Sequence, residues 1–349
     1  MINKSFFSTE ILRWFRENGR DLPWRETRDP YAIWLSEIIL QQTRIAQGWE
    51  YWERFMQTYP KVEDLAAASE DDVLKLWQGL GYYSRARNLH TAAKQIVALG
   101  DFPNTLEGIK SLKGVGDYTA AAIGSFAFDI QAAVVDGNVY RVLSRYFGID
   151  TPINSTQGKK EFAALAQSLL PASDAASYNQ GMMDFGAIQC TPQSPKCLLC
   201  PLAETCEALR CGRVEELPVK NKTVKVKTRH LSYIYIRCKS SAADGAGKSE
   251  PMVAIHRRGE GDIWQGLWEP YNVSDVKELP SFVKNPVLLA KDVKHVLTHR
   301  ILLADFYLLE TESRPRLPDD YIWIKESEIE DYGVPRLIEI MLEKINPAE

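Results

Sequence analysis

Four cysteines close together constrain this chain more than any other feature of its sequence. They follow the spacing C-x6-C-x2-C-x5-C and are Cys190, Cys197, Cys200 and Cys206. Residues 1–7 lack the basic start and apolar core of a secretory signal, so we expect a reducing compartment in which disulfides do not form. Thiolates packed this closely repel one another unless a cation binds between them. The spacing therefore predicts a metal-containing site.

The kind of metal follows from the ligands and from the loops between them. Sulfur ligation without a neighbouring histidine is typical of structural zinc and of iron–sulfur clusters. Loops of six and five residues differ from the two C-x2-C pairs of a zinc ribbon. We predict an iron–sulfur cluster, and structural zinc or four unrelated buried thiols are the alternatives. Cys211 and Cys238 lie outside the pattern.

Length and charge limit the remaining possibilities. A chain of 349 residues can form about two domains, each with its own core. The net charge of -4 argues against a generally basic surface, so any contact with nucleic acid must be local. No run of about 18 apolar residues is present, which argues against a membrane partner and favours a cytoplasmic protein.

Two hydrophobic periods divide the chain. From residue 5 to 190 apolar side chains recur at three- and four-residue spacing, as in 71–76 and 86–99, which predicts an all-α domain. From about Val224 the period becomes two, and we expect strands at 231–237, 252–256 and 301–309. We place the all-α domain at 1–212, a linker at 213–229 and a β-rich domain at 230–349.

The linker carries a short run of cations. They are Lys220, Lys222, Lys225, Lys227 and Arg229. Such a run fits contact with phosphates or a merely solvated connection, and both interpretations stay open. Residues 240–250 are small and polar, which predicts a mobile hairpin loop.

A Gly-x-Gly turn opens onto an alanine-rich helix at residues 112–120. Because Gly114 and Gly116 have no side chains, backbone amides there can approach a phosphate, and the helix N-terminus adds partial positive charge. A plain turn between helices is the alternative. With helices on both sides, we predict a helix-hairpin-helix, which binds DNA through its backbone.

Two acidic residues stand out as candidates for chemistry. Glu37 shares one face of a predicted helix with Ile33 and Leu40, and a carboxyl on an apolar face has a raised pKa and can act as a general acid. Asp136 precedes a helix together with Asn138. An exposed or salt-bridged glutamate and simple helix capping are the alternatives.

In combination, these features resemble the endonuclease III superfamily of DNA glycosylases. The hairpin, the sequence VDG at 135–137 and the cysteine loop carry the resemblance. Within the superfamily the chain resembles the MutY family, which removes adenine mispaired with 8-oxoguanine, most closely at 35–43 (LSEIILQQT) and 79–88 (GLGYYSRARN). The resemblance implies an enzyme of base excision repair with a 4Fe-4S cluster. It also implies double-stranded DNA with adenine opposite 8-oxoguanine or guanine as the partner, and we expect a monomer.

The resemblance also implies roles for individual residues. Bifunctional members carry a lysine after the hairpin where this chain has Tyr118, so a monofunctional hydrolase is expected. Glu37 would protonate N7 of adenine, and Asp136 would stabilise the oxocarbenium-like sugar or bond to it transiently; both versions stay open. Tyr118 and Asn138 would orient Asp136 and the sugar. The expected adenine pocket comprises Trp24, Arg25 and Gln180.

Chemistry on a paired base requires flipping the base out of the duplex. By the same resemblance Gln42 and Tyr82 enter the duplex, and Thr43 and Leu80 lie beside the lesion, with Gly114 and Gly116 on the backbone. The alternative for Tyr82 is packing at a helix end. For Gln42 and Thr43 it is an exposed helix end.

Residues 262–269 resemble a segment of Nudix-like domains, which implies an α/β Nudix-like domain that recognises 8-oxoguanine. Residues 259–300 lack the Arg-Glu-x-x-Glu-Glu core of a working Nudix hydrolase, so we expect a binding module only. Its recognition loop would be Leu297, Thr298 and His299, where family members commonly have Phe-Ser-His. The Thr298 hydroxyl can still donate and accept a hydrogen bond. A strand of the core is the alternative for this segment.

Two other functions stay in view. A pyrimidine glycosylase with lyase activity would need the lysine that Tyr118 replaces. A non-catalytic DNA-binding scaffold would leave the pairing of Glu37 with Asp136 unexplained.

Overall fold

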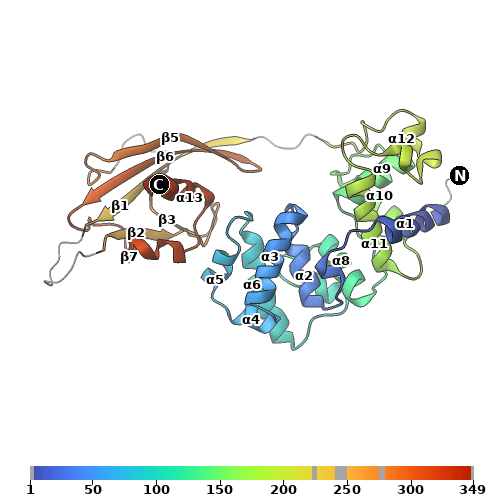
Figure 1. The fold of residues 1–349 in the computed structure, drawn as a ribbon, viewed down its shortest axis with the longest axis horizontal. Coiled ribbons are helices and arrows are strands. Elements are labelled where there is room, and N and C mark those ends of the chain that lie inside the picture. The colour runs from blue at the N-terminus through green and yellow to red at the C-terminus, as the bar shows by residue number, and fades with distance from the viewer. Residues whose placement is uncertain (1–3, 222–225, 240–249, 275–279, 347–349) are drawn as a thin grey trace. The chain divides into compact units, whose positions relative to one another are not determined.

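The computed structural model describes residues 4–221, 226–239, 250–274 and 280–346. The chain forms two compact units (Figure 1). The first comprises residues 1–66 and 91–222, and the second comprises residues 67–90 and 223–349. Helix α6 (Ser84–Leu99) runs through the boundary between them.

The first unit is helical. Its longer helices are α1 (Lys4–Asn18), α2 (Pro30–Ile39), α3 (Ile45–Thr58), α4 (Val62–Ala67), α7 (Leu106–Lys110), α8 (Asp117–Phe128), α9 (Gly137–Phe147), α10 (Thr156–Leu169), α11 (Ala175–Asp184) and α12 (Glu207–Arg210). Short helical turns lie at η1 (Pro23–Arg25), η2 (Phe185–Gln189), η3 (Cys197–Leu199) and η4 (Ala203–Thr205). The turn η2 is a π-helix that continues α11 directly.

An apolar cluster joins α1, α9, α10 and α11. Phe7, Ile11, Leu143 and Phe162 are fully buried in it. The four helices place one face each in this core because their apolar residues recur at helical spacing. Helix α9 ends at Gly148, whose φ of 70° lies in the left-handed region that glycine adopts readily. The packed cluster fixes α9 and α11, which carry several of the candidate site residues.

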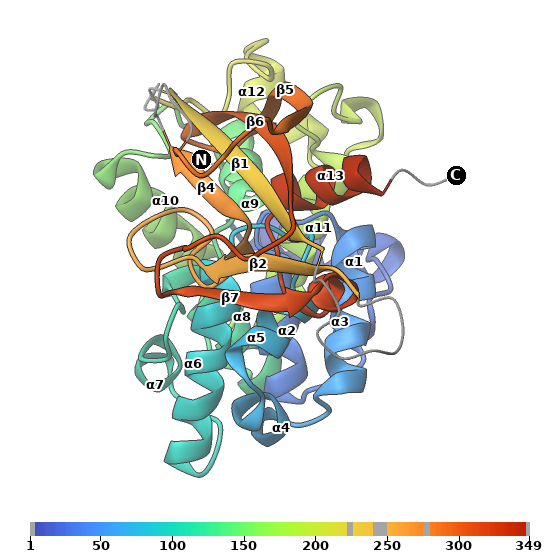
Figure 2. The same ribbon diagram turned by 90° about the vertical axis from the view of Figure 1, so that its left-hand side faces the viewer.

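The second unit contains α5 (Glu70–Leu76), a seven-stranded sheet and a C-terminal helix. The strands are β1 (Lys227–Cys238), β2 (Met252–Arg257), β3 (Trp268–Glu269), β4 (Tyr271–Ser274), β5 (Val287–Val296), β6 (Arg300–Thr311) and β7 (Tyr321–Lys325). The turn η5 (Glu326–Asp331) and α13 (Arg336–Ile345) follow. The strand order is β3-β2-β1-β6-β5, with β4 also pairing with β1 and β7 with β2. Figure 2 shows β7 alongside β2. Strands β1 and β6 are parallel, and the other pairs are antiparallel.

Strand β1 is buried on both faces. Tyr233 and Tyr235 belong to the cluster that includes Leu337 and Met341 of α13, and Ile234 belongs to a cluster on the other face. Successive side chains of a strand point to opposite faces, so β1 joins two apolar layers.

The fold confirms the prediction of a helical domain followed by a domain of strands and helices. The three predicted strands correspond to β1, β2 and β6, while the other four strands and α13 were not predicted. Strand β1 begins at Lys227, inside the stretch predicted as a linker. The predicted loop at 240–250 and the linker residues Lys222 and Lys225 fall largely outside the described residues.

Candidate active site and iron–sulfur loop

Glu37 lies near the end of α2 with its side chain turned into the protein. Asp29 caps this helix by accepting a hydrogen bond from the Tyr31 amide (3.0 Å), and Pro30 occupies the first helical position. Glu37 is only 7% exposed. Burial raises the pKa of its carboxyl to about 7, although the hydrogen bond from Tyr118 opposes the shift. Glu37 can therefore hold a proton close to neutral pH, as a general acid must.

The helix-hairpin-helix brings Tyr118 to Glu37. In the turn between α7 and α8, Gly114 has a φ of 79°, and the space beside Gly116, where a side chain would begin, is open. Tyr118 lies in the first turn of α8 and donates a hydrogen bond from Oη to Oε2 of Glu37 (3.0 Å). Burial and the charges of Glu37 and Asp136 raise the pKa of Tyr118, so its hydroxyl remains a donor. The hairpin thus has a second role besides any contact with DNA.

Asp136 is both a helix cap and a neighbour of Glu37. Its carboxylate accepts hydrogen bonds from the Val139 amide (2.8 Å) and from Nδ2 of Asn138 (2.7 Å). Burial raises the pKa of Asp136, and these hydrogen bonds oppose the shift. The charge of Asp136 in turn raises the pKa of Glu37, so the two carboxyl groups are close enough to interact. Asp136 can therefore cap its helix and also form an acidic pair with Glu37.

Arg25 is fixed by a buried aspartate that the sequence analysis missed. Asp184, at the end of α11, is completely buried and accepts hydrogen bonds from Nη1 and Nη2 of Arg25, both at 2.8 Å. Arg20 donates to the same carboxylate from its amide and from Nε, both at 2.9 Å. The charge of Arg25 lowers the pKa of Glu37, so Arg25 lies within electrostatic reach of the acid.

The other two residues predicted for the adenine pocket, Trp24 and Gln180, lie near Arg25 and Asp184 in the sequence. Trp24 is buried, and its ring packs edge-on against Trp49 and Trp52, with ring centroids 6.0 and 5.8 Å apart. Gln180 is half-buried on α11, one helical turn before Asp184. Their contact with a base stays a prediction.

A second residue missed from sequence, Arg141, connects Asp136 to the cysteine loop. Nη2 of Arg141 donates to Oδ1 of Asn138 (2.8 Å) and to the Gly186 carbonyl (2.6 Å). Its Nε donates to the carbonyl of Cys190 (2.8 Å). A continuous chain of hydrogen bonds therefore runs from Asp136 through Asn138 and Arg141 to the first cysteine.

The four patterned cysteines line one hollow, together with Arg145, Gln189 and Leu209. All four are half-buried and free of disulfides. Burial raises the pKa of Cys200 to about 12 and also raises the pKa values of Cys197 and Cys206. Deprotonating several such thiols together requires a strong positive charge between them, which the iron atoms of a cluster supply.

Sulfur from four cysteines is the usual ligand set of an iron–sulfur cluster. Cys190, Cys197, Cys200 and Cys206 meet this requirement, because all four line the same hollow. Nη1 of Arg145 also donates to Sγ of Cys190 (3.5 Å).

The two residues predicted to enter the duplex share an unusual backbone conformation. Gln42 has a φ of 57° and Tyr82 a φ of 46°, both in the left-handed region that side-chain-bearing residues rarely adopt. Gln42 is exposed, and Tyr82 is 49% exposed despite its aromatic ring. Thr43 is half-buried, whereas Leu80, predicted beside the lesion, is buried.

The predicted recognition loop is a tight turn. Leu297, Thr298 and His299 connect β5 to β6, and the Leu297 amide donates to the Arg300 carbonyl (2.8 Å). Leu297 packs against the core of the second unit, while Thr298 and His299 are exposed. The turn therefore leaves the Thr298 side chain at the surface, unlike a strand of the core.

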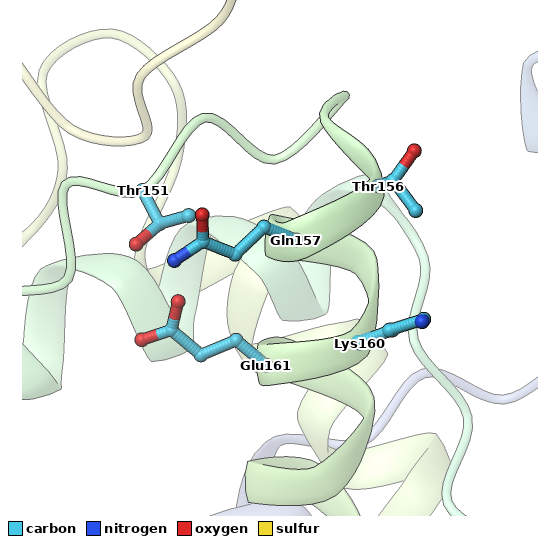
Figure 3. A pocket seen from close by; sticks show the side chains of 5 residues that line it. All are labelled: Thr151, Thr156, Gln157, Lys160 and Glu161. Atoms are coloured by element: carbon cyan, nitrogen blue, oxygen red, sulfur yellow. The ribbon is translucent and has the colours of Figure 1, made fainter.

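A separate hollow at the start of α10 contains none of the predicted site residues. Thr151, Thr156, Gln157, Lys160 and Glu161 line it. Figure 3 shows Gln157 and Glu161 on the side of Thr151, with Thr156 and Lys160 directed away from them. These side chains do not converge on a common point, so the candidate site remains at Glu37 and Asp136.

Three family profiles match successive parts of the chain. Residues 35–171 match the HhH-GPD superfamily of base excision DNA repair proteins, and residues 190–206 match the iron-sulfur binding domain of endonuclease III. Residues 247–344 match the NUDIX domain. No helix in the described part of the chain is both long and apolar enough to cross a bilayer.

Relatives and solved structures agree with these profiles. Adenine DNA glycosylase of Buchnera aphidicola subsp. Acyrthosiphon pisum is 31% identical over 98% of this chain and 98% of its own. The chain belongs to the adenine DNA glycosylase family. Adenine DNA glycosylase of Homo sapiens is 42% identical over 60% of this chain, but this match covers only 41% of the human protein. A thermostable thymine-DNA glycosylase has a similar structure, with a TM-score of 0.56, 34% identity and coverage of 60% of this chain and 97% of its own.

Membership of the adenine DNA glycosylase family confirms several predictions. The chain is a hydrolase that acts on N-glycosyl bonds in DNA, with an iron–sulfur cluster held by the loop at 190–206 and a Nudix-like domain at its C-terminal end. A non-covalent endonuclease III–DNA complex shares the helical fold, with a TM-score of 0.53 at 23% identity.

Proposed function

We propose that this chain excises adenine paired with 8-oxoguanine or guanine as a monofunctional glycosylase acting on a flipped base. The observation that supports this most directly is the buried Glu37 carboxyl, with its pKa near 7, beside Asp136. Adenine is a poor leaving group as an anion, so a protonated acid is the group that its release requires. We also propose that the enzyme acts as a monomer in the cytoplasm.

The reaction divides between the two carboxyl groups. Glu37 gives its proton to N7 of adenine, and the bond between N9 and C1′ breaks with its electron pair going to the base, which departs neutral. The sugar becomes oxocarbenium-like, and ionised Asp136 stabilises its positive charge or bonds to C1′ for a time. Water then adds at C1′, and where Asp136 had bonded to C1′ its carboxylate leaves with the electron pair of that bond. The proton that the water loses restores Glu37.

The neighbouring residues keep each carboxyl group in its role. Tyr118 holds Oε2 of Glu37, which leaves Oε1 to carry the proton. The Val139 amide and Asn138 each bond to Asp136, and each carboxylate oxygen has a second lone pair for the sugar. The iron–sulfur cluster would anchor the loop that bonds to Arg141, so it would support Asn138 from behind.

A lyase is the second candidate, and Tyr118 argues against it. A Schiff base requires an amine beside the sugar. Tyr118 follows the hairpin at the position where bifunctional members have lysine, and its hydroxyl is already engaged with Glu37.

The experiment is a comparison of base release and strand scission on one set of duplexes. Adenine is placed opposite 8-oxoguanine, guanine or thymine, and thymine glycol opposite adenine is included. We expect adenine release opposite the first two bases, without scission until alkali is added. Scission without alkali would establish a lyase. Binding without any base release would establish a scaffold, and Asp136→Asn should bind DNA but lose base release.

A further inference from the structure

Three basic side chains gather at one end of the sheet in the second unit. Strands β1 and β6 run parallel, with Lys227 opposite Arg300 and Arg229 opposite Leu302. Alternation along each strand therefore puts Lys227, Arg229 and Arg300 on the same face as the buried Leu302 and Leu231. The apolar core covers the middle of this face, and the three cations lie beyond its edge.

Asp262 orients the arginines of this group. Its carboxylate accepts from Nη1 of Arg229 at 2.6 and 2.9 Å and from Nη1 of Arg300 at 3.2 Å. Nη2 of Arg258 also donates to it (2.8 Å), but Nη1 of Arg258 bonds to the buried Glu269. In the described part of the chain, Asp262 is the one side chain that hydrogen-bonds to the Arg300 guanidinium. Most of the Arg300 donors thus remain available to a ligand.

The same cations lie beside the predicted recognition turn. Arg300 follows His299 directly, and the Lys227 amide donates to the His299 carbonyl (3.2 Å). The Arg300 side chain is 42% exposed, and Lys227 and Thr298 are exposed as well. A strand of DNA whose base touches Thr298 would therefore bring its backbone close to these charges.

We propose that Lys227, Arg229 and Arg300 bind backbone phosphates of the DNA strand whose base Thr298 contacts. The proposal rests on the proposed function, and it adds which side chains hold the strand that carries the recognised base. Guanidinium groups bind phosphate through two parallel hydrogen bonds, and Asp262 holds two of them in fixed orientations for this. Because the whole chain has a net charge of -4, contact with DNA depends on such local groups. Phosphate contacts set the register of the duplex without reading its sequence.

The test is the salt dependence of DNA binding by the full-length holoenzyme. We would compare the wild type with Arg300→Gln, Lys227→Gln and the double variant, by fluorescence anisotropy at several salt concentrations. Each lost phosphate contact lowers the slope of log affinity against log salt by about 1, so the double variant loses about 2. Affinity falls by a similar factor for 8-oxoguanine and guanine duplexes, because phosphates carry no sequence information.

Lys239→Gln is the matched control. Lys239 follows the opposite end of β1 and pairs with Glu310 (2.8 Å), so this variant removes the same charge from the same unit. We expect it to keep the wild-type slope. Unchanged slopes in Arg300→Gln and Lys227→Gln, or an equal loss in Lys239→Gln, would overturn the proposal. If the slopes changed as expected but the wild type did not excise adenine, the proposed function would be refuted and the phosphate contacts would stand.

Discussion

The hydroxyl of Tyr82 hydrogen-bonds to the hydroxyl of Thr298, although 216 residues separate them in the chain. Tyr82 is the residue expected to enter the duplex, and Thr298 is the one expected to meet 8-oxoguanine. Both belong to the second unit. The contact therefore joins the residue expected to enter the duplex to the turn expected to recognise the lesion.

This contact predicts coupled effects on lesion choice. Tyr82→Phe keeps the ring but removes the hydroxyl, and Thr298→Val removes its partner. We expect each single variant to lower the preference for 8-oxoguanine over guanine by up to about tenfold, because one hydrogen bond is worth about 1 kcal/mol. The double variant should lose little more, because both substitutions remove the same hydrogen bond. Single-turnover excision rates of the four proteins opposite each base measure this. Tyr332→Phe is the control, because it removes a tyrosine hydroxyl from the same unit at a ring that packs against Trp268. Additive losses in the double variant would show that the hydroxyls of Tyr82 and Thr298 act separately.

The raised pKa of Glu37 predicts how base release depends on pH. The carboxyl acts as an acid only when protonated, so the rate should fall about tenfold per unit as pH rises beyond about 7. Glu37→Gln should bind DNA normally but release adenine roughly 100- to 10,000-fold more slowly, with no such pH dependence. A wild-type rate that stays constant up to pH 9 would rule out Glu37 as the proton donor.

The same residue predicts a stability cost at alkaline pH. The pKa of Glu37 is about 7 in the folded protein against an ordinary value of 4.5, so the folded state favours the protonated form. This contribution is complete below about pH 4.5 and is lost as pH rises to about 7. Because each pKa unit corresponds to about 1.4 kcal/mol, Glu37→Gln should be about 3 kcal/mol more stable than wild type at pH 8.

Urea unfolding at pH 5 and pH 8 provides the measurement. The advantage of Glu37→Gln should shrink at the lower pH. The matched control is Glu50→Gln, which makes the same substitution at an exposed position on α3. Equal stabilities of wild type and Glu37→Gln at pH 8 would show that burial does not destabilise the ionised carboxylate of Glu37.

Removing one cysteine ligand of the cluster should weaken DNA binding before it slows base release. Cys197→Ser removes one iron ligand from a loop that has little core of its own, so the loop should lose order and DNA affinity should fall. The purified wild type should be brown, with iron and sulfide in stoichiometric amounts. Cys211→Ser, outside the pattern, is the control and should keep its iron. Zinc in place of iron would refute the assignment.

The sequence predicted those parts of the site that are marked by spacing or by periodic burial. The cysteine loop and the helix that carries Glu37 are local patterns, and they were found. Asp184 was missed because it is a single helical aspartate whose partner Arg20 is 164 residues away. Arg141 was missed for a similar reason, although its place three residues after Asn138 on one helix was a usable signal.

The limits of the fold prediction have physical causes as well. Strand β5 has two register shifts and several exposed residues, so its alternation is weak. Strand β3 has only two residues. The burial of Leu80 depends on tertiary packing, which a resemblance in the local motif does not report.

Replacing Asp184 should lower the stability of the protein by a large amount, although this residue lies outside every motif expected from the sequence. Its buried carboxylate pairs with Arg20 and Arg25; burial alone would raise its pKa, but the hydrogen bonds from these arginines outweigh burial and lower it. Asp184→Asn leaves the two guanidinium groups without their anion, and breaking a buried pair costs about 3–5 kcal/mol. Because the pKa is lowered in the folded state, the stabilisation is present at neutral pH and declines as pH falls through the folded pKa. Urea unfolding at pH 7 should show the loss, and Asp184→Glu should recover part of it. The control is Asp174→Asn, at the exposed residue just before α11, which makes no capping hydrogen bond and should change stability by less than about 0.5 kcal/mol. If Asp184→Asn were as stable as wild type, Arg25 would have to be held by other contacts, and its position beside Glu37 would not depend on this pair.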